Sequence, residues 1–311
     1  MKINAFKRKI KTVLYNPKNI LIKILYKISP FIKDEQYLKV LFFLKLGYKL
    51  DIKNPKTYNQ KLQWLKLYYR NPITTQMVDK FLVKDFAKEI IGEKYLVQSY
   101  GIWNSFDEID FNVLPKSFVL KTTHDQGGVI IVRDKNKLDK EYAKNKLSKH
   151  LNRQHYFLSR EWPYKNVKPR IMAEALLIDN EVDDLYDYKF YCFDGEPKIM
   201  YIAHGRHTDT CYLDFYDMEF NKLNISRPHY PQSNIKFQIP KNWELMKELS
   251  KKISKNFPHL RVDFYNINGR IYLGELTFFQ GGGLMKFEPQ EWDFKLGELI
   301  NLDKVKDHES C

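Results

Sequence analysis

Cysteine is scarce in this chain of 311 residues, and no cysteine pattern points to a metal. The three cysteines, Cys192, Cys211 and Cys311, form no Cys-x-x-Cys pair, which argues against a zinc site and against a disulfide framework. No apolar run approaches the roughly 18 residues that a transmembrane helix needs. Residues 1–30 are basic and partly apolar, but they lack the unbroken apolar core and small-residue cleavage site of a signal peptide. These absences predict a soluble protein of the reducing cytosol.

Several catalytic and binding motifs are also missing. The chain has no Gly-x-Ser-x-Gly sequence, the nucleophile elbow of many serine hydrolases, and no Walker A loop. It has no recognisable nucleic-acid reading motif either, so we expect no nucleic acid partner. It does have 43% apolar residues, including 21 Phe and 21 Tyr, which can fill the core of one large or two modest domains.

The positive charge is concentrated at the N-terminus. Residues 1–70 contain 17 Lys or Arg and 3 Asp or Glu, a net charge of +14 that equals the net charge of the whole chain. Within this segment, residues 20–28 and 37–44 have the pattern of amphipathic helices, interrupted at Ser29-Pro30. Such helices can contact an anionic membrane surface or an acidic glycan. The alternative is that they cap a catalytic core and display their lysines to water.

The most informative segment lies between Arg261 and Thr277, where the pattern predicts two strands joined by a tight turn. Residues alternate sides along a strand, so Arg261 and Asp263 share a face on the first strand, and Glu275 and Thr277 share a face on the second. Two carboxylates and an arginine on one side of a hairpin suit Mg²⁺ and phosphate oxygens. The alternative is a surface hairpin with cross-strand ion pairs.

The length of the turn decides whether the two carboxylates meet. A two-residue turn at Asn268-Gly269 would point Asp263 and Glu275 to opposite faces. A three-residue loop over residues 267–269, with its glycine left-handed, shifts the register by one residue. We expect the three-residue loop, which pairs Asp263 with Leu273 and places both carboxylates on one face.

Two further segments suit a nucleotide. A strand ending near Lys121 is followed by a polar loop with Gly127-Gly128 and a return strand. A lysine ammonium is a point charge for phosphate, and glycines let backbone N–H groups approach closely. Residues 170–177 predict a strand whose backbone and Glu174 can meet a purine, and the next hairpin should turn at Asp194-Gly195.

The order of these features resembles the ATP-grasp superfamily, and the closer resemblance is to the TupA-like ATP-grasp family of cell-surface polysaccharide and teichuronopeptide gene clusters. It extends over residues 54–297, and seven short motifs occur in family order. These motifs are Asn59-Gln-Lys-Leu-Gln-Trp-Leu-Lys66, Val78-Asp-Lys80, Phe118-Val-Leu-Lys121, Leu158-Ser-Arg-Glu-Trp162, Asp187-Tyr-Lys-Phe190, Arg261-Val-Asp-Phe-Tyr265 and Gly274-Glu-Leu-Thr277. The resemblance implies an α+β protein with the ATP-grasp fold, in which two α/β subdomains grip ATP and Mg²⁺.

The resemblance also implies roles for individual residues. Arg261 and Lys121 would be the catalytic groups, with Arg261 neutralising the transferred phosphoryl group and Lys121 reaching the α- and β-phosphates. The nucleotide would contact Lys80, Lys121, the flap Gln126, Gly127 and Gly128, the adenine hinge Glu174, Ala175 and Leu176, and Asp187 near the ribose. The Mg²⁺ ligands would be Asp263, Glu275 and Thr277. The substrate candidates are Arg160, Glu161, Lys189, Gly281 and Gly282.

Some of these assignments have alternatives. ATP-grasp enzymes usually have asparagine at the position of Thr277, whose hydroxyl can still bind Mg²⁺ but more loosely. Arg160 and Glu161 can instead form an interdomain salt bridge over a buried Trp, and residues 281–283 can be a flexible turn. About 75 residues precede Lys80, where most ATP-grasp ligases have a Rossmann-like domain.

The resemblance and the charge pattern together divide the chain into four parts. These are a basic helical segment at 1–75, a lid subdomain at 76–170, a C-terminal subdomain with the metal hairpin at 171–300 and a polar tail at 301–311. We expect helices over residues 60–69 after a cap at Thr57 or Asn59, over 138–151 and over 243–256.

The function implied is that of an ATP-dependent carboxylate–amine ligase in surface-polysaccharide biosynthesis. Its partners would be a small-molecule or saccharide carboxylate and an amine, with an anionic membrane or an acidic glycan as a possible contact of residues 1–70. We expect it in the cytoplasm, with a peripheral position at the inner face of the membrane as the alternative. Two alternatives stay open. One is a glycosyltransferase that uses a nucleotide sugar, a label often given to the family, and the other is a non-catalytic glycan- or membrane-binding protein.

Overall fold

A computed structural model describes residues 17–179, 185–206 and 208–308. Residues 1–16 of the predicted basic segment and residues 309–311 of the predicted tail lie outside this range. The α-helices are α2 (Pro17–Ile28), α3 (Asp34–Leu46), α4 (Tyr58–Tyr68), α5 (Ile73–Val78), α6 (Val83–Ile91), α7 (Lys140–Leu151), α8 (Tyr156–Ser159), α9 (Trp243–Ser254), α10 (Glu291–Glu298) and α11 (Asp303–His308). The strands are β1 (Ser99–Trp103), β2 (Phe118–Thr122), β3 (Val129–Val132), β4 (Ile171–Glu174), β5 (Asp187–Phe193), β6 (Glu196–His204), β7 (Tyr212–Asp217), β8 (His259–Ile267) and β9 (Arg270–Thr277). Short 3-10 helices are η1 (Ser29–Phe31), η2 (Glu93–Tyr95), η3 (Phe106–Glu108), η4 (Lys135–Lys137), η5 (Trp162–Asn166) and η6 (Gln280–Gly283).

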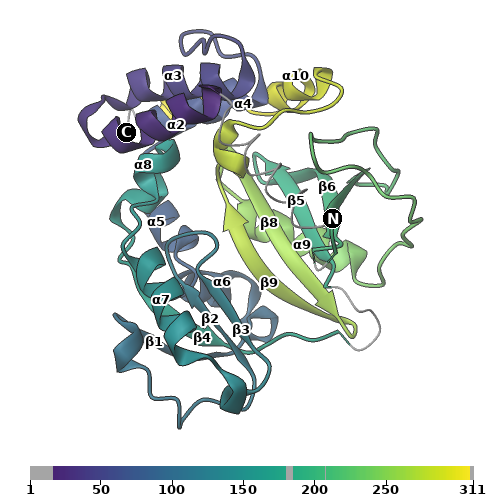
Figure 1. Cartoon of the computed structure of the whole chain (residues 1–311). Helices are drawn as coiled ribbons and strands as arrows, with labels where there is room; N and C mark the ends of the chain where they lie inside the picture. The colour runs from purple at the N-terminus through teal and green to yellow at the C-terminus, as the bar shows by residue number, and fades with distance from the viewer. Residues whose placement is uncertain (1–16, 180–184, 207, 309–311) are drawn as a thin grey trace, which may run out of the picture.

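The strands form two antiparallel sheets, one at the lower left and one at the right of Figure 1. Residues of both sheets line one cavity, the cleft. The four-stranded sheet has the order β1-β4-β2-β3, and the five-stranded sheet has the order β7-β6-β5-β8-β9. Strand β4 pairs with β1 and β2. The chain therefore leaves the first sheet after Glu174, whereas the sequence placed the subdomain boundary between residues 170 and 171.

Helices α2, α3 and α4 lie together at the top of the molecule in Figure 1. Helix α3 ends at Gly47, whose φ of 88° allows the left-handed C-cap. Helix α4 begins after Thr57, which accepts a hydrogen bond from the Gln60 N–H in a capping box, so Thr57 rather than Asn59 is the cap. Helices α2 and α3 have a small core of their own, while Tyr58 of α4 joins the core of the five-stranded sheet.

Alternation along the central strands sorts side chains between the two faces of the five-stranded sheet. Phe190 of β5 lies on the face covered by α9, with its ring centroid 5.4 Å from that of Trp243 and 6.2 Å from that of Phe264. Lys189 of β5 and Asp263 of β8 directly precede Phe190 and Phe264 in the chain. Their side chains therefore point to the other face of the sheet, where they contact each other. One face of this sheet is therefore a hydrophobic core, and the other carries charged side chains.

The β8–β9 hairpin differs from the expectation in the length of its turn, but it does place the two carboxylates on one face. Asn268-Gly269 alone forms the turn, with φ of 49° and 74°, so the expected three-residue loop is wrong. A bulge at Gly274 shifts the register instead and pairs Asp263 with Glu275. The two carboxylates lie on one face because of this bulge. The second expected hairpin turn, at Asp194-Gly195, joins β5 to β6 as predicted.

Candidate functional site

The two sheets meet at a small cavity of about 70 Å³. It is lined by Lys80, Val83, Lys84, Leu96, Val97, Lys121, Glu174, Leu177, Tyr265, Leu273, Gly274 and Glu275. Four predicted site residues from distant parts of the chain therefore share one cavity. A larger cavity of about 800 Å³, lined by Arg70, Lys255 and Lys304 among others, has none of the predicted site residues in its lining.

On the four-stranded sheet, Glu174 holds two lysines. It forms ion pairs with Lys121 of β2 and, at 3.1 Å, with Lys84 of α6. Burial alone would raise the pKa of the Glu174 carboxyl, but the two ammonium groups outweigh burial and hold this pKa below its ordinary value. Burial also lowers the pKa of Lys84. This side of the cleft therefore has two cations on one carboxylate.

Lys80 lies against the predicted flap, the loop between β2 and β3. Its ammonium donates to the Asp125 carbonyl, and its backbone N–H donates to the Thr123 carbonyl at 3.0 Å. Burial lowers the pKa of Lys80. At Gly128, a Cβ would lie 2.1 Å from the Thr122 hydroxyl oxygen, so the close approach of these two segments requires glycine there.

The other two flap residues differ in environment. Gln126 is exposed, and Gly127 has a φ of 87° that favours glycine. Between Thr122 and these residues, Asp125 is buried and bonded to the His150 ring and the Thr122 hydroxyl. The loop is thus anchored at its base.

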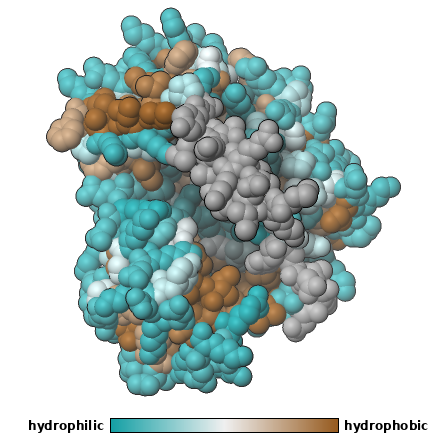
Figure 2. All heavy atoms as spheres, in the orientation of Figure 1, coloured by the Kyte–Doolittle hydropathy of each residue, from teal (hydrophilic) through white to brown (hydrophobic). Residues whose placement is uncertain are grey.

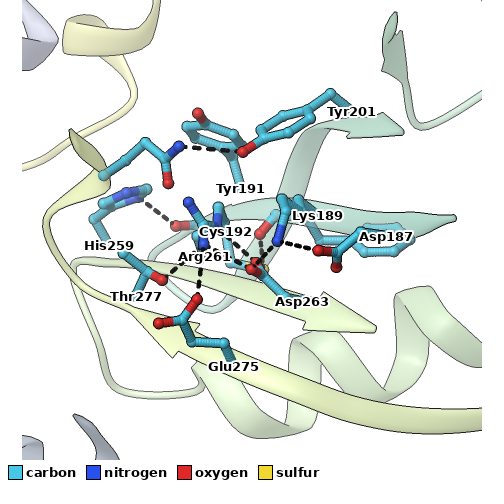
Figure 3. Close-up of polar contacts among 12 residues, drawn as sticks. Asp187, Lys189, Tyr191, Cys192, Tyr201, His259, Arg261, Asp263, Glu275 and Thr277 are labelled. Carbon is cyan, nitrogen blue, oxygen red and sulfur yellow. Dashed lines mark hydrogen bonds and ion pairs between the residues drawn. The ribbon is translucent and has the colours of Figure 1, made fainter. Parts of the chain in front are cut away.

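On the five-stranded sheet, Arg261 holds both predicted carboxylate ligands (Figure 3). Its Nε and Nη2 atoms each donate to Asp263 at 2.6 Å, and Nη2 donates to the Thr277 hydroxyl at 2.8 Å. The same Nη2 lies 3.6 Å from a Glu275 carboxylate oxygen. The predicted Mg²⁺ ligands and the predicted catalytic arginine are therefore adjacent.

Lys189 extends this cluster into a chain of buried charges. It forms ion pairs with Asp263 and, at 2.8 Å, with Asp187, which Arg206 contacts at 2.6 Å. Burial alone would lower the pKa of Lys189, but Asp187 and Asp263 outweigh burial and raise it. Burial would raise the pKa of Asp263, but Arg261 and Lys189 hold it below its ordinary value. Both groups are therefore charged at neutral pH.

The oxygen donors on this face fit Mg²⁺. Within the described residues, no group of three or more His, Cys, Asp or Glu side chains is placed to bind a metal alone. Asp263 and Glu275 are cross-strand partners with the Thr277 hydroxyl in the same cluster. Mg²⁺ is commonly held by one or two carboxylates together with phosphate oxygens and water. Glu275 is about one-third exposed, while Asp263 must exchange a cation partner to reach a metal.

The predicted substrate residue Arg160 points away from the cleft. Its guanidinium pairs with Asp34 of α3 at 2.7 Å and donates to the carbonyls of Ser29 and Ile32. Arg160 therefore forms a salt bridge to the N-terminal helices, in agreement with the alternative interpretation of an interdomain salt bridge. The ring beneath the guanidinium is that of Tyr37, at 4.2 Å, rather than a tryptophan.

Glu161, the next residue, lies on the opposite side of the chain. Its buried carboxylate accepts a hydrogen bond from the Ser159 hydroxyl at 2.6 Å and lies 3.8 Å from the His155 ring. A Cβ on Gly282 would lie 3.6 Å from the same carboxylate. The structure thus brings the substrate candidates Glu161 and Gly282 together, with Gly281 beside them in η6 at a φ of 55°.

Lys66 joins these elements from α4. Its buried ammonium donates to the Gln63 side-chain oxygen at 3.0 Å, the Ser159 carbonyl at 2.7 Å and the Gly282 carbonyl at 2.5 Å. Burial lowers the pKa of Lys66 to about 8, although Glu161 acts in the opposite direction. A buried lysine therefore ties α4 to Ser159 and to η6, the segment that follows β9.

A model of the TupA-like ATP-grasp family matches residues 60–301. The chain belongs to this family. Membership confirms the predicted α+β ATP-grasp fold and, with it, ATP and Mg²⁺ as the cofactors of the superfamily. No curated protein matches the chain.

Solved structures that resemble this TupA-like ATP-grasp protein are distant. D-alanine–D-alanine ligase from Helicobacter pylori is 18% identical, with a TM-score of 0.43, over 80% of this chain and 70% of that chain. The ADP complex of PurK, an N5-carboxyaminoimidazole ribonucleotide synthetase, is 16% identical, with a TM-score of 0.42, over 70% and 50%. The ATP-grasp ligase PsnB with Mg and ADP is 10% identical, with a TM-score of 0.39, over 96% and 72%. The family assignment rests on the match over residues 60–301.

Several cleft residues of this TupA-like ATP-grasp protein escaped the sequence analysis. Lys84 gave no clear signal, because α6 begins at Val83 and Lys80 lies in the turn before this helix. Leu177 lines the cavity, whereas Ala175 and Leu176, predicted for the adenine hinge, do not, and the Ala175 N–H donates to the Gln98 carbonyl at 2.9 Å. The apolar residues Val83, Leu96, Val97 and Leu273 gave no signal that separates them from core residues.

Proposed function

We propose that this protein is an ATP-dependent carboxylate–amine ligase that works through an acyl phosphate in cell-surface polysaccharide biosynthesis. The observation that carries the proposal is the shared cavity, in which Lys80, Lys121 and Glu174 of one side face Glu275 of the other. Cations suited to phosphate oxygens thereby share a single gap with Glu275, one of the two carboxylates suited to Mg²⁺.

The roles of the residues follow from their partners. Lys80 and Lys121 would bind phosphate oxygens, and Glu174 would sit at the adenine end. Asp263 and Glu275, with Thr277, would hold Mg²⁺, which when bound neutralises charge on the phosphates. Arg261 would stabilise the charge that develops on the transferred phosphoryl group, because its guanidinium is fixed between Asp263 and Thr277 and needs no reorganisation.

The reaction has two steps. A carboxylate oxygen of the acid substrate would attack the γ-phosphorus, forming an acyl phosphate and releasing ADP. A deprotonated amine would then attack the carbonyl carbon, forming the amide and releasing inorganic phosphate. Catalysis would consist mainly of positioning and charge neutralisation.

We propose that Glu161 receives the amine. Its carboxylate is buried, and the hydroxyl of Ser159 satisfies one oxygen at 2.6 Å. A buried carboxylate favours a cationic partner, and a substrate ammonium would supply one and pass a proton to this carboxylate before the amine attacks. Gly281 and Gly282 lie beside it in η6, where both have left-handed φ values that favour glycine.

The pathway and the acceptor rest on the family resemblance. We propose a uronic acid sugar or an amino acid as the carboxylate, and a saccharide or small molecule as the acceptor, in the cytoplasm or at the inner face of the membrane. The alternative in the same pathway is a glycosyltransferase in which Asp263 and Glu275 hold a metal on the diphosphate of a nucleotide sugar.

The test is an ADP-release assay over a panel of carboxylates and amines, with mass spectrometry of the product. We expect ADP release to need both substrates and an amide to form. MgATP should also raise the melting temperature, because a ligand at 100-fold its Kd adds roughly 2.7 kcal/mol to the folded state. A glycosidic product formed without ADP release would overturn the ligase assignment.

A further inference from the structure

The outer surface of the N-terminal helices carries a row of exposed apolar side chains. Ile20, Leu21, Ile24 and Ile28 of α2 are each about half exposed, and Phe31 of η1 is 90% exposed. Their spacing of three and four residues puts them on one side of α2. Figure 2 shows a brown strip at the upper left of the molecule, in the region where Figure 1 places α2.

This row is not the face on which α2 packs. The inward side chains Ile22 and Leu25 of α2 are buried against Tyr37, Leu38 and Leu41 of α3. Arg160 also ties η1 and α3 to the rest of the molecule through Asp34. The helix pair is therefore fixed in place without the outer row, which is left exposed to solvent in the part of the chain that the structure describes.

Lysines surround the apolar row. Lys23, Lys27 and Lys33 are exposed beside it, and residues 17–56 contain nine lysines against three acids. Two of the three acids are engaged, since Asp34 pairs with Arg160 and Glu35 with Lys39. In the sequence, residues 1–16 add five more basic residues and no acid. Apolar side chains and positive charge thus occupy the same surface.

We propose that this surface, formed by α2, η1 and α3, docks the protein on an anionic lipid bilayer. The apolar row would enter the headgroup boundary while the lysines contact lipid phosphates, as in interfacial amphipathic helices. No described helix is both long and apolar enough to cross a bilayer, so the contact lies in the plane of the surface. A soluble polyanion would use the lysines but has no use for an exposed phenylalanine, and this favours the bilayer.

The experiment is co-sedimentation of the full chain with vesicles, using two double variants and two matched controls. The apolar variant is Ile24→Ser with Phe31→Ser, and its control is Val113→Ser with Ile131→Ser, which are exposed positions on the other lobe. The charge variant is Lys23→Glu with Lys27→Glu, and its control is Lys137→Glu with Lys149→Glu. All replaced side chains are exposed, so melting temperatures should match the wild type.

We expect the wild type to bind phosphatidylglycerol vesicles and to dissociate from them as salt rises. It should not bind phosphatidylcholine vesicles. Both surface variants should lose about tenfold or more in partitioning, since each lysine near such a membrane contributes about fivefold, while both controls stay within about twofold. Equal binding to neutral and anionic vesicles, or equal losses in surface and control variants, would overturn the proposal. Competition by a soluble acidic polysaccharide would also overturn it, if the polysaccharide displaces the vesicles and binds the apolar variant as tightly as the wild type.

A second measurement places the surface directly. Phe31→Trp should be quenched by brominated lipids in anionic vesicles, beyond any quenching of the native tryptophans, and Val113→Trp should not. Absence of added quenching at position 31 would also overturn the proposal. The MgATP-induced melting shift should be the same in every variant, so failure of docking is distinguishable from failure of the ligase assignment.

Discussion

The four-stranded sheet presents a surplus of cations to the cleft, whereas the five-stranded sheet presents charges that balance one another. On the first side, Lys121 and Lys84 share the single carboxylate of Glu174, and Lys80 is bonded to a backbone carbonyl. On the second side, Arg261 and Lys189 alternate with acids along a buried chain. The first side can therefore attract an anion as it stands, while the second must exchange partners before it can bind a cation.

The largest effect should come from breaking the balanced side. Asp263→Asn removes the carboxylate that both Arg261 and Lys189 contact, and two buried cations lose a partner. Breaking a buried ion pair from one side costs about 3–5 kcal/mol of folding free energy. Urea unfolding of the variant should show a loss of this size, together with loss of ADP formation.

Glu275→Gln is the matched control for that variant. Its carboxylate is about one-third exposed and 3.6 Å from Arg261, so its removal should cost about 1 kcal/mol or less. ADP formation should still be lost. Equal stability losses in the two variants would contradict the contrast between a buried and an open carboxylate on this face.

The next effect concerns Lys66, which lies on neither sheet and whose hydrogen-bond acceptors are all uncharged. Burial lowers the pKa of Lys66 from its ordinary value of 10.5 to about 8. Below pH 8 the folded state carries the full cost of the buried charge, and this cost is relieved as the pH rises toward 10.5. At 1.36 kcal/mol per pKa unit, the contribution of Lys66 to the unfolding free energy should rise by about 3 kcal/mol across this window.

Comparison with Lys66→Met isolates that contribution. The difference in unfolding free energy, wild type minus variant, should increase between pH 8 and 10.5 and stay flat from pH 6 to 8. Lys137→Met, an exposed lysine, should show no such increase. A flat difference across the whole range would mean that Lys66 keeps an ordinary pKa.

The cation surplus of the four-stranded sheet predicts a smaller effect, on binding rather than on folding. Lys121→Met should weaken binding of a nonhydrolysable MgATP analogue about 10- to 100-fold, because hydrogen bonds to charged groups contribute about 1.5–3 kcal/mol. Lys84 remains to neutralise Glu174, so the fold should be nearly as stable as the wild type. Calorimetric titration measures the affinity, and an unchanged Kd would remove Lys121 from the nucleotide site.

The smallest effect should come from Thr277→Val. This change removes the hydroxyl that accepts from Arg261 at 2.8 Å, while Asp263 still holds the guanidinium. We expect a loss of about 1 kcal/mol in unfolding free energy and a modest rise in the Mg²⁺ concentration needed for half-maximal ADP formation. An unchanged Mg²⁺ dependence would show that the hydroxyl serves Arg261 alone.

The hairpin shows what sequence can and cannot give in advance. Its two strands followed from alternation, and the shared face of Asp263 and Glu275 was expected from a shift of register by one residue. The choice of turn length was wrong because the register shift came from Gly274, inside the strand, rather than from the loop. A glycine in a strand interior is a known sign of a bulge, so this signal was present.

Arg160 shows the opposite case. Its partner Asp34 lies far earlier in the chain, and nothing local marks the pair. Lys189 was predicted as a substrate residue, but its position between Asp187 and Asp263 depends on the pairing of β5 with β8. Contacts that depend on strand order and helix placement come from tertiary packing, which local patterns do not encode.

Arg160 and Glu161 are neighbours in the chain that point in opposite directions, and this has a consequence for making chimeras. The left-handed conformation of Arg160, at a φ of 57°, sends one side chain to the N-terminal helices and the other toward Gly282. The N-terminal helices are therefore not an exchangeable module. A graft from another family member must bring Asp34 and the carbonyls of residues 29 and 32 into register with Arg160, or the transplanted helices will displace the carboxylate next to it.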